Sequence, residues 1–350
     1  MAEPDFPPPP APELPELPEL HALVVGRDAM ACRFEVVFNA GEVSDATELG
    51  LAALDLVDAI EDRITVYRDS SELARLNATA PQGWQPVAAD LVALLTHARS
   101  LHERTAGGFD PAAGSLVRAW GFLRRQGRTP DAPTLAAARA AAGMEHVEID
   151  EVAGRVRFTR SGLELNLGAI GKGWALDAVI GMLTAAGVAS VLVHGGSSSV
   201  RAIGLQGPAL PGRRGWRVGI RHPLRPGRRL ATVTLVDAAL GTSGSGTQFF
   251  VDRGRRLGHI LDPRSGLPAE GVLSSTVIAP RAADADALST ALYVLGPAGL
   301  ERIAPAGGDC AAVLVVPARN PANVRVLTAN LDPQLVVWDP GEGLEVVHVV

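Results

Sequence analysis

The chain has one lysine, Lys172, and it lies in the glycine-rich segment LNLGAIGKGWALD, residues 165–177. Gly171 and Gly173 let the backbone approach a ligand closely, and a helix expected to begin near Gly173 offers free N–H groups to an anion. A P-loop has the pattern G-x-x-x-x-G-K-[ST], but here Asn166 replaces the first glycine and Gly173 the Ser/Thr. Two interpretations remain: an anion contact through Lys172, or a strand-to-helix turn with a solvated lysine.

A carboxylate and a hydroxyl share one helix face in the segment DADALSTAL, residues 284–292. Asp286 and Thr290 are four residues apart, the spacing of neighbours on a helix surface. Hard oxygen ligands of this kind suit Mg²⁺ or Ca²⁺. An acidic first turn, with Asp284 or Asp286 as its cap, explains the same residues without a metal.

His259 is the second residue of the segment GHILDPRSG, residues 258–266, and its setting is unusually glycine-rich for a histidine. Asp-Pro starts a type I turn well, so the turn itself needs no function. The same D-P-x-x-G form recurs at Asp110–Gly114. Spacing alone leaves a structural His259 and a catalytic one equally open.

Other site types have no support in the sequence. The patterns H-E-x-x-H and G-x-S-x-G are absent, and no G-x-G-x-x-G follows a strand. The net charge of −6 gives no electrostatic case for nucleic acid as the main partner. One Arg-rich stretch, residues 212–229, is expected to form exposed turns around a short strand, with docking of an acidic partner as the alternative.

The composition fits a large globular chain with a proline-rich start. The 350 residues, 47% of them hydrophobic, can bury a sizeable core. Residues 1–20 are expected to form a disordered or polyproline II tail. No secretion signal, lipidation site or membrane span is recognisable, which predicts a cytoplasmic protein. Cys32 and Cys310 have no metal spacing and are expected to be buried free thiols.

Helix and strand patterns mix along residues 21–350 without a clear linker, which predicts a single domain. Helices are expected over 44–64 with Ser44 as N-cap, then over 88–105, 133–143, 174–187 and 283–296. The first should bury Leu49, Ala53, Leu56 and Ile60, and the second Leu91, Leu94, Ala98 and Leu101. Strands are expected over 31–38, 189–196, 229–240 and 272–280, in a hairpin over 146–160, and in a closing run after Cys310. This order is not a regular βαβ alternation, so it favours α+β or mixed α/β.

Six motifs, taken together and in order, resemble the ApbE family of FAD:protein FMN transferases. The resemblance spans about Met30 to Gly296. The matching segments are Met30-Ala31-Cys32; Tyr67 with Ser71, Glu72, Leu73, Leu76 and Asn77; Gly108-Phe109-Asp110-Pro111 with the Trp-Gly-Phe at 120–122; Asn166 through Asp177; Thr242-Ser243-Gly244 with His259 to Gly266; and Ala285 to Ala291.

The resemblance implies a fold, a reaction and a partner. The fold would be an ApbE-like, T-fold-like arrangement of mixed sheets packed with helices. Such enzymes bind FAD and Mg²⁺, cleave the diphosphate, and move FMN onto a Thr or Ser hydroxyl of a target flavoprotein, releasing AMP. Phosphoryl transfer of this kind needs neutralised charge and an oriented hydroxyl.

The resemblance also implies residue roles. The residues expected to contact FAD are Met30, Tyr67, Gly108, Phe109, Asp110, Asn166, Lys172 and Ile260. The expected metal ligands are Asp286, Thr290 and the backbone carbonyl of Ala169. His259 is the expected base for the acceptor hydroxyl, because a neutral imidazole is available near pH 7.

Three departures from the family pattern keep alternatives open. Asn166 replaces the usual Asp, Ala112 follows Asp-Pro where Thr is frequent, and GGSSS at 195–199 lacks the usual Gly-Gly-Asp. A non-catalytic flavin-binding protein and an FAD pyrophosphatase, which would release AMP and free FMN, are the alternatives. A further alternative is an interaction protein that uses the Arg-rich stretch and the proline-rich tail. This alternative predicts that the protein binds no flavin.

Overall fold

The computed structural model describes residues 21–124, 126–208, 214–225, 227–244, 246, 248–320, 322–339 and 344–348. The proline-rich tail expected over residues 1–20 lies outside this range. The helices are α1 Ala46–Ile64, α2 Glu72–Thr79, α3 Ala89–Arg104, α4 Gly114–Ala119, α5 Ala132–Ala141, α6 Gly171–Ala185, α7 Ala282–Leu295 and α8 Leu300–Ile303.

A nine-stranded sheet organises the described chain, in the order β1-β2-β6-β7-β10-β15-β16-β17-β19. All neighbours are antiparallel except β17 and β19. Its strands are β1 Ala22–Ala29, β2 Cys32–Asn39, β6 Val191–Gly195, β7 Ser199–Ile203, β10 Ala239–Gly244, β15 Ser274–Ala279, β16 Ala311–Pro317, β17 Val324–Ala329 and β19 Leu344–His348.

Smaller sheets complete the structure. They are β8 Trp216–Arg221 and β9 Arg229–Leu235 with β18 Val336–Trp338; β3 Gln85–Pro86 with β4 Val147–Asp150 and β5 Arg155–Phe158; β11 Phe249–Asp252 with β12 Arg255–Gly258; and β13 Leu261–Asp262 with β14 Leu267–Pro268.

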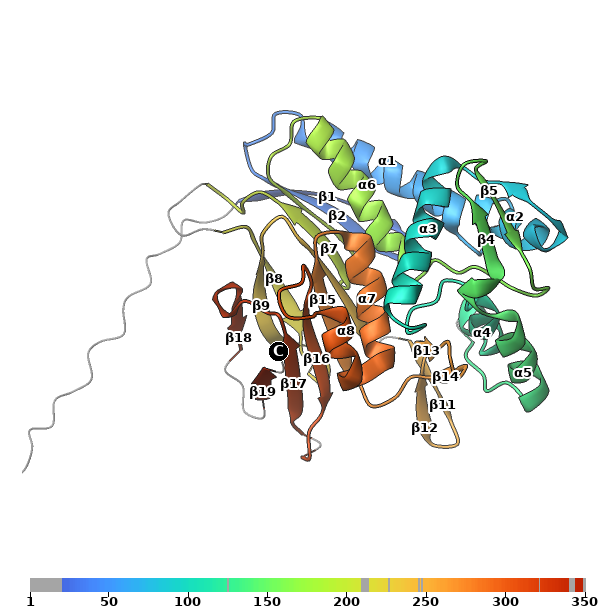
Figure 1. The fold of residues 1–350 in the computed structure, drawn as a ribbon. Helices are drawn as coiled ribbons and strands as arrows, with labels where there is room; N and C mark the ends of the chain where they lie inside the picture. Colours follow the sequence, from blue (N-terminus) through green and yellow to red (C-terminus); the bar gives the residue numbers. More distant parts are fainter. Residues whose placement is uncertain are drawn as a thin grey trace, which may run out of the picture.

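Helices and a second sheet cover the two faces of the large sheet. Helices α1, α6 and α7 lie along one face (Figure 1), where their buried side chains join those of β2 and β6 in the largest core. The opposite face packs on β8, β9 and β18 through a second apolar cluster that includes Trp216, Val233 and Val313. Both faces of the sheet are therefore buried at its inner strands, which explains the near-continuous apolar run of β6.

The mixed α+β fold expected from the sequence is confirmed. Helix α3 buries Leu91, Leu94, Ala98 and Leu101 as its spacing predicts. The hairpin over 146–160 forms as β4 and β5. Cys32 and Cys310 are free thiols, although Cys32 is only half-buried.

Several local predictions were wrong. Residues 229–240 form two strands in different sheets, because the chain bends at Asp237, whose φ is +47°. Helix α1 begins with Asp45 as N-cap and without a side-chain cap bond, so Ser44 does not cap it. Its inward stripe is also shifted, because Ala53 and Ile60 are buried with Leu54 and Val57, while Leu49 and Leu56 are half-buried.

Two further differences concern the start of elements. Helix α6 begins at Gly171 rather than near Gly173, so Lys172 lies in its first turn. Strand β1 was not predicted, because half of its residues are exposed or polar and give no clear alternation.

Candidate functional site

A cleft of about 520 Å³ collects the residues singled out in the sequence. It is lined by the β1–β2 turn, the segment before α2, the loop before α4, the start of α6, the end of β10, the segment after β12, and α7. The predicted residues that line it are Met30, Tyr67, Gly108, Phe109, Asp110, Asn166, Ala169, Lys172, His259, Ile260, Asp286 and Thr290. Residues up to 260 positions apart in the chain therefore line the same cleft.

The Asp286 carboxylate is buried and oriented by two donors. Its side chain is 6% exposed. The Gly173 N–H donates to Oδ2 at 2.8 Å, and the Ser199 hydroxyl donates to Oδ1 at 2.7 Å. Because a carboxylate accepts about four hydrogen bonds, lone pairs remain on both oxygens for a cation in the cleft.

Thr290 lies one helical turn beyond Asp286, as its spacing predicts. Its hydroxyl donates to the Asp286 carbonyl at 3.2 Å and lies 3.1 Å from the Ser243 hydroxyl. Asp286, Thr290 and Ala169 all line the cleft, and between them these residues carry a carboxylate, a hydroxyl and a backbone carbonyl oxygen. This donor set has the hard-oxygen chemistry that Mg²⁺ prefers.

The single lysine stands beside this carboxylate. Lys172 Nζ is 4.0 Å from Asp286 Oδ2. Burial raises the pKa of Asp286, while the Lys172 ammonium and the Ser199 and Gly173 donors oppose the rise. The ammonium therefore helps to keep the carboxylate charged and adds positive charge to the wall of the cleft.

A close contact between α6 and α7 sets this geometry. A Cβ at Gly173 would lie 2.1 Å from the Ala282 carbonyl oxygen, so only glycine allows the two helices to approach here. The Asp177 carboxylate accepts the N–H groups of Ala282 at 2.8 Å and Ala283 at 3.0 Å, and thereby caps the first turn of α7.

The loop that carries Ala169 is fixed by amide side chains. Asn77 accepts the Leu165 N–H at 2.8 Å and donates to the Leu165 carbonyl at 2.9 Å. Asn166 Oδ1 accepts the Gly168 N–H at 2.9 Å. The amide at position 166 thus shapes the turn as an aspartate would, but without the negative charge.

His259 lies on another part of the cleft wall, directly after β12. Its backbone N–H and its Nδ1 both lie within hydrogen-bond distance of the Gln248 carbonyl oxygen, at 3.2 and 3.1 Å. Because a carbonyl only accepts, Nδ1 carries the proton and Nε2 keeps its lone pair. Burial lowers the pKa of His259, and Lys172 lowers it further. A neutral imidazole with an available Nε2 can accept a proton.

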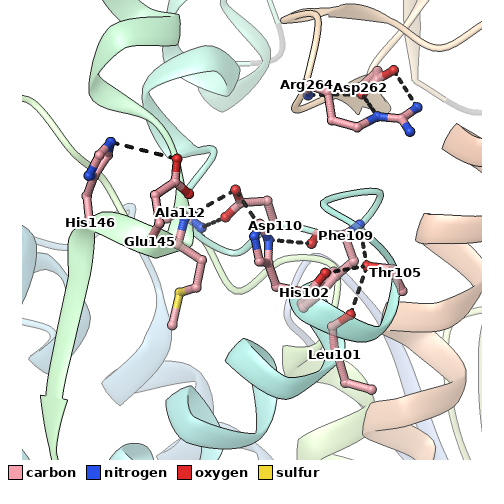
Figure 2. A network of polar contacts seen from close by, with 11 residues as sticks. Leu101, His102, Thr105, Phe109, Asp110, Ala112, Glu145, His146, Asp262 and Arg264 are labelled. Atoms are coloured by element: carbon pink, nitrogen blue, oxygen red, sulfur yellow. Dashed lines mark hydrogen bonds and ion pairs between the residues drawn. The ribbon is translucent and has the colours of Figure 1, made fainter.

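The Asp110 carboxylate is committed to its own loop. Figure 2 shows it accepting the Ala112 N–H, at 2.7 Å, with His102 Nδ1 3.5 Å away. Burial raises the pKa of Asp110, and His102 opposes the rise. The potential ligand atoms of His102, Asp110 and Glu145 lie close enough together to hold a metal ion. However, His102 Nδ1 lies 3.1 Å from the Phe109 carbonyl and Asp110 already accepts backbone donors, so the cluster is structurally satisfied.

Met30 reaches the cleft through a strained turn. Met30 and Ala31 join β1 to β2 with φ values of +47° and +60°, a conformation that favours glycine. The Met30 N–H donates to Glu61 Oε2 at 2.5 Å, which ties the turn to α1. Tyr67, by contrast, lies at an exposed edge with 69% of its surface accessible.

The sequence did not identify several residues that position the site. Ser199 does not line the cleft but donates to Asp286, and in the sequence it stands out only within GGSSS, residues 195–199, as a departure from the family pattern. Glu61 and Gln248 line the cleft and hold Met30 and His259. No local signal identifies them, because each acts on a residue remote in the sequence or on a backbone group.

The model of the ApbE family matches residues 30–314, more than half of the chain. The chain belongs to the ApbE family. The match includes every segment of the cleft wall, so the site lies wholly inside the ApbE region.

Curated members of the ApbE family are similar to this chain over most of their length. An FAD:protein FMN transferase of Treponema pallidum is 38% identical over 289 residues, which are 78% of this chain and 77% of that protein. The FAD:protein FMN transferase of Escherichia coli is 30% identical over 247 residues, 69% of each chain.

Solved ApbE structures have the same fold. The apo flavinyl transferase ApbE of Pseudomonas stutzeri superposes with a TM-score of 0.77 at 29% identity and covers 89% of this chain and 95% of its own. The ApbE protein of Thermotoga maritima gives a TM-score of 0.76 at 28% identity and covers 85% of this chain and 94% of its own.

Among the described residues, no helix is both long and apolar enough to cross a membrane.

Proposed function

We propose that this chain is an Mg²⁺-dependent FAD:protein FMN transferase that moves FMN onto a Thr or Ser hydroxyl of a target protein and releases AMP. The observation that carries the proposal is the single cleft in which Lys172, Asp286, Thr290 and His259 meet, inside the ApbE match. The relatives named above are called FAD:protein FMN transferases, which supports the transfer of FMN from FAD to a protein.

The metal would be held by the Asp286 carboxylate, the Thr290 hydroxyl and the Ala169 carbonyl. Mg²⁺ takes few protein ligands and fills its octahedron with water and phosphate oxygens. When bound, it would neutralise charge on the diphosphate. Lys172 supplies a fixed positive charge on the same wall, which favours binding of an anionic diphosphate.

FAD would fill the cleft along the remaining predicted residues. The other predicted residues that line the cleft are Met30, Tyr67, Gly108, Phe109, Asp110, Asn166 and Ile260. Gly108 lets its loop pack closely on α7, because a Cβ there would lie 2.9 Å from the Leu295 side chain. Asp110 acts by holding this loop, since its oxygens already accept backbone N–H groups.

The transfer step exchanges one P–O bond for another. The acceptor hydroxyl oxygen attacks the phosphorus of the FMN half, and the bridging P–O bond breaks so that AMP leaves with the oxygen. His259 Nε2 takes the hydroxyl proton, while its Nδ1–H stays bonded to Gln248. Because burial favours the neutral imidazole, the base is ready at neutral pH.

The metal assignment is tested with Asp286→Asn, which keeps the shape of the side chain. Mg²⁺ titration by calorimetry should show binding to the wild type with FAD and a loss of at least about tenfold in affinity in the variant. AMP release should fall with it. Unchanged Mg²⁺ affinity in a folded Asp286→Asn protein contradicts the assignment. Wild-type protein that binds FAD without any AMP release favours a flavin-binding protein, and AMP with free FMN favours a pyrophosphatase.

A further inference from the structure

Glu61, in the last turn of α1, contacts two separate segments of the cleft wall. Its Oε2 accepts the Met30 N–H at 2.5 Å, in the turn between β1 and β2. Its Oε1 lies 3.9 Å from Nη2 of Arg68, the residue directly after Tyr67. Glu61, Met30 and Tyr67 all line the cleft. One carboxylate therefore joins two segments that are expected to contact FAD.

The turn that carries Met30 is held in a conformation that its side chains disfavour. Ala29 pairs with Cys32, so Met30 and Ala31 form a two-residue hairpin loop in which both φ values are positive. Loops of this form favour Asn and Gly, and other residues are strained in them. Strained backbone persists where the surrounding structure holds it, and it is concentrated at ligand sites. The Met30 N–H lies outside the β1–β2 ladder, and the bond to Glu61 supplies the hold on this turn.

The segment with Tyr67 is tied to the same helix by ionic contacts. Arg68 Nη2 lies 2.7 Å from Asp62 Oδ1 and 3.9 Å from Glu61 Oε1. The Arg68 side chain is 48% exposed, so these ion pairs contribute little to the free energy of unfolding. Because both carboxylates belong to α1, they instead limit where the exposed Tyr67 can lie relative to the Met30 turn.

We propose that Glu61 is a positioning residue for FAD, which holds the strained Met30 turn and, through Arg68, the Tyr67 segment at the spacing that FAD needs. This inference rests on the proposed function, because it takes Met30 and Tyr67 as FAD contacts. The Glu61 carboxylate would repel the anionic diphosphate, so it acts through its two neighbours rather than as a ligand of FAD. Without Glu61, a smaller fraction of the protein has the binding-competent wall, and the apparent FAD affinity falls by that fraction.

The test separates the two contacts of Glu61. Glu61→Ala removes both, whereas Glu61→Gln keeps an acceptor for the Met30 N–H and loses the charge that faces Arg68. Flavin fluorescence measures FAD affinity, and AMP release gives KM and kcat. Glu61→Ala should weaken FAD binding by at least about tenfold, the effect of one hydrogen bond to a charged group, with kcat at saturating FAD within about twofold of wild type. Glu61→Gln and Arg68→Gln should show equal and smaller losses of affinity.

Ala31→Gly provides a rescue that a purely structural role of Glu61 does not predict. Position 31 has a φ of +60°, which glycine adopts without strain, so the turn then depends less on Glu61. The double variant Ala31→Gly/Glu61→Ala should bind FAD at least about twofold more tightly than Glu61→Ala, which is the coupling expected between neighbouring residues. A double variant that binds FAD no better than Glu61→Ala would overturn the proposal.

Asp58→Ala is the matched control on the same helix. Asp58 lies three residues before Glu61 and ties α1 to β1 through Arg27, at 2.6 Å, but it is not among the residues that line the cleft. This variant should bind FAD as wild type does. Equal losses of FAD affinity in Asp58→Ala and Glu61→Ala, or a Glu61→Ala protein with wild-type affinity, would overturn the proposal. A wild-type protein that neither binds nor cleaves FAD would show that the proposed function is wrong, and this inference would fall with it.

Discussion

The Ser199 hydroxyl donates a 2.7 Å hydrogen bond to Oδ1 of Asp286, and both side chains are buried. The two residues lie on β7 and α7, 87 positions apart. Together with the Gly173 N–H on Oδ2, this bond fixes the rotation of the carboxylate toward the cleft. In metal sites, replacing a residue that orients a ligand typically lowers metal affinity by about 10- to 100-fold, and Ser199 would have this role if Asp286 holds Mg²⁺ as proposed.

Ser199→Ala should weaken Mg²⁺ binding by roughly 10- to 100-fold, because Asp286 loses one of its two orienting donors. Calorimetric titration in the presence of FAD measures the change. Ser275→Ala is a matched control, since Ser275 is also buried and donates to the Ser289 carbonyl of the same helix without touching Asp286. Loss of Mg²⁺ affinity in both variants would mean that the effect is a general loss of packing.

Gly173→Ala should disrupt the site through the backbone. The added Cβ would lie 2.1 Å from the Ala282 carbonyl oxygen, so α6 and α7 must separate and the Gly173–Asp286 bond must lengthen. We expect lower thermal stability together with loss of Mg²⁺ binding.

Gly181→Ala in the same helix serves as the comparison for this substitution. No atom lies within 4 Å of a Cβ placed there, so the variant should gain about 1 kcal/mol of stability from the better helix former. A Gly173→Ala protein as stable as Gly181→Ala would contradict the close-contact explanation.

The pH dependence of transfer should follow the neutral form of His259. Burial lowers its pKa below the ordinary 6.5, so the imidazole gains its proton only at more acidic pH. The rate at saturating FAD should be flat across neutral pH and fall with an acid limb below 6.5. His259→Gln should remove this limb and lower the rate by about 100-fold or more, with FAD affinity nearly unchanged. A collapse of FAD binding with a normal residual rate would make His259 a binding residue.

Ala31→Gly should stabilise the protein. Ala31 has a φ of +60°, where glycine is relaxed and alanine costs about 1 kcal/mol. The urea midpoint of unfolding should rise because the strain at position 31 is relieved. The rise is reduced by the larger conformational entropy that a glycine loses on folding. Ala52→Gly, at an exposed position of α1, should shift it the opposite way by about 1 kcal/mol. Equal shifts in both variants would exclude strain at Ala31.

Elements with a complete local pattern were predictable from the sequence. Helix α3 has four apolar residues at helical spacing, and all four are buried. The division of residues 229–240 was not predictable, because the chain bends at Asp237 without a glycine or proline to mark the break. The pairing of β18 with β9 was equally hidden, since the residues that pair are more than 100 positions apart in the chain.

The candidate site was predictable only as a set of motifs. Each named residue, from Met30 to Thr290, lies on the cleft wall. The contacts that position them were not, because Ser199 and Gly173 reach Asp286 from segments 87 and 113 residues away. Composition and spacing give the type of a side chain and the face of its own helix or strand on which it lies. Neither identifies a hydrogen-bond partner from a remote segment of the chain.

The most direct test of FMN transfer is intact-protein mass spectrometry of an acceptor flavoprotein incubated with this protein, FAD and Mg²⁺, with AMP measured in the same reaction. We expect the acceptor to gain one FMN mass through a Thr or Ser, in equal amount to the AMP released, and to gain nothing when Mg²⁺ is chelated. AMP formed without a mass gain on any acceptor, or FAD bound with no AMP at all, would contradict the transferase function.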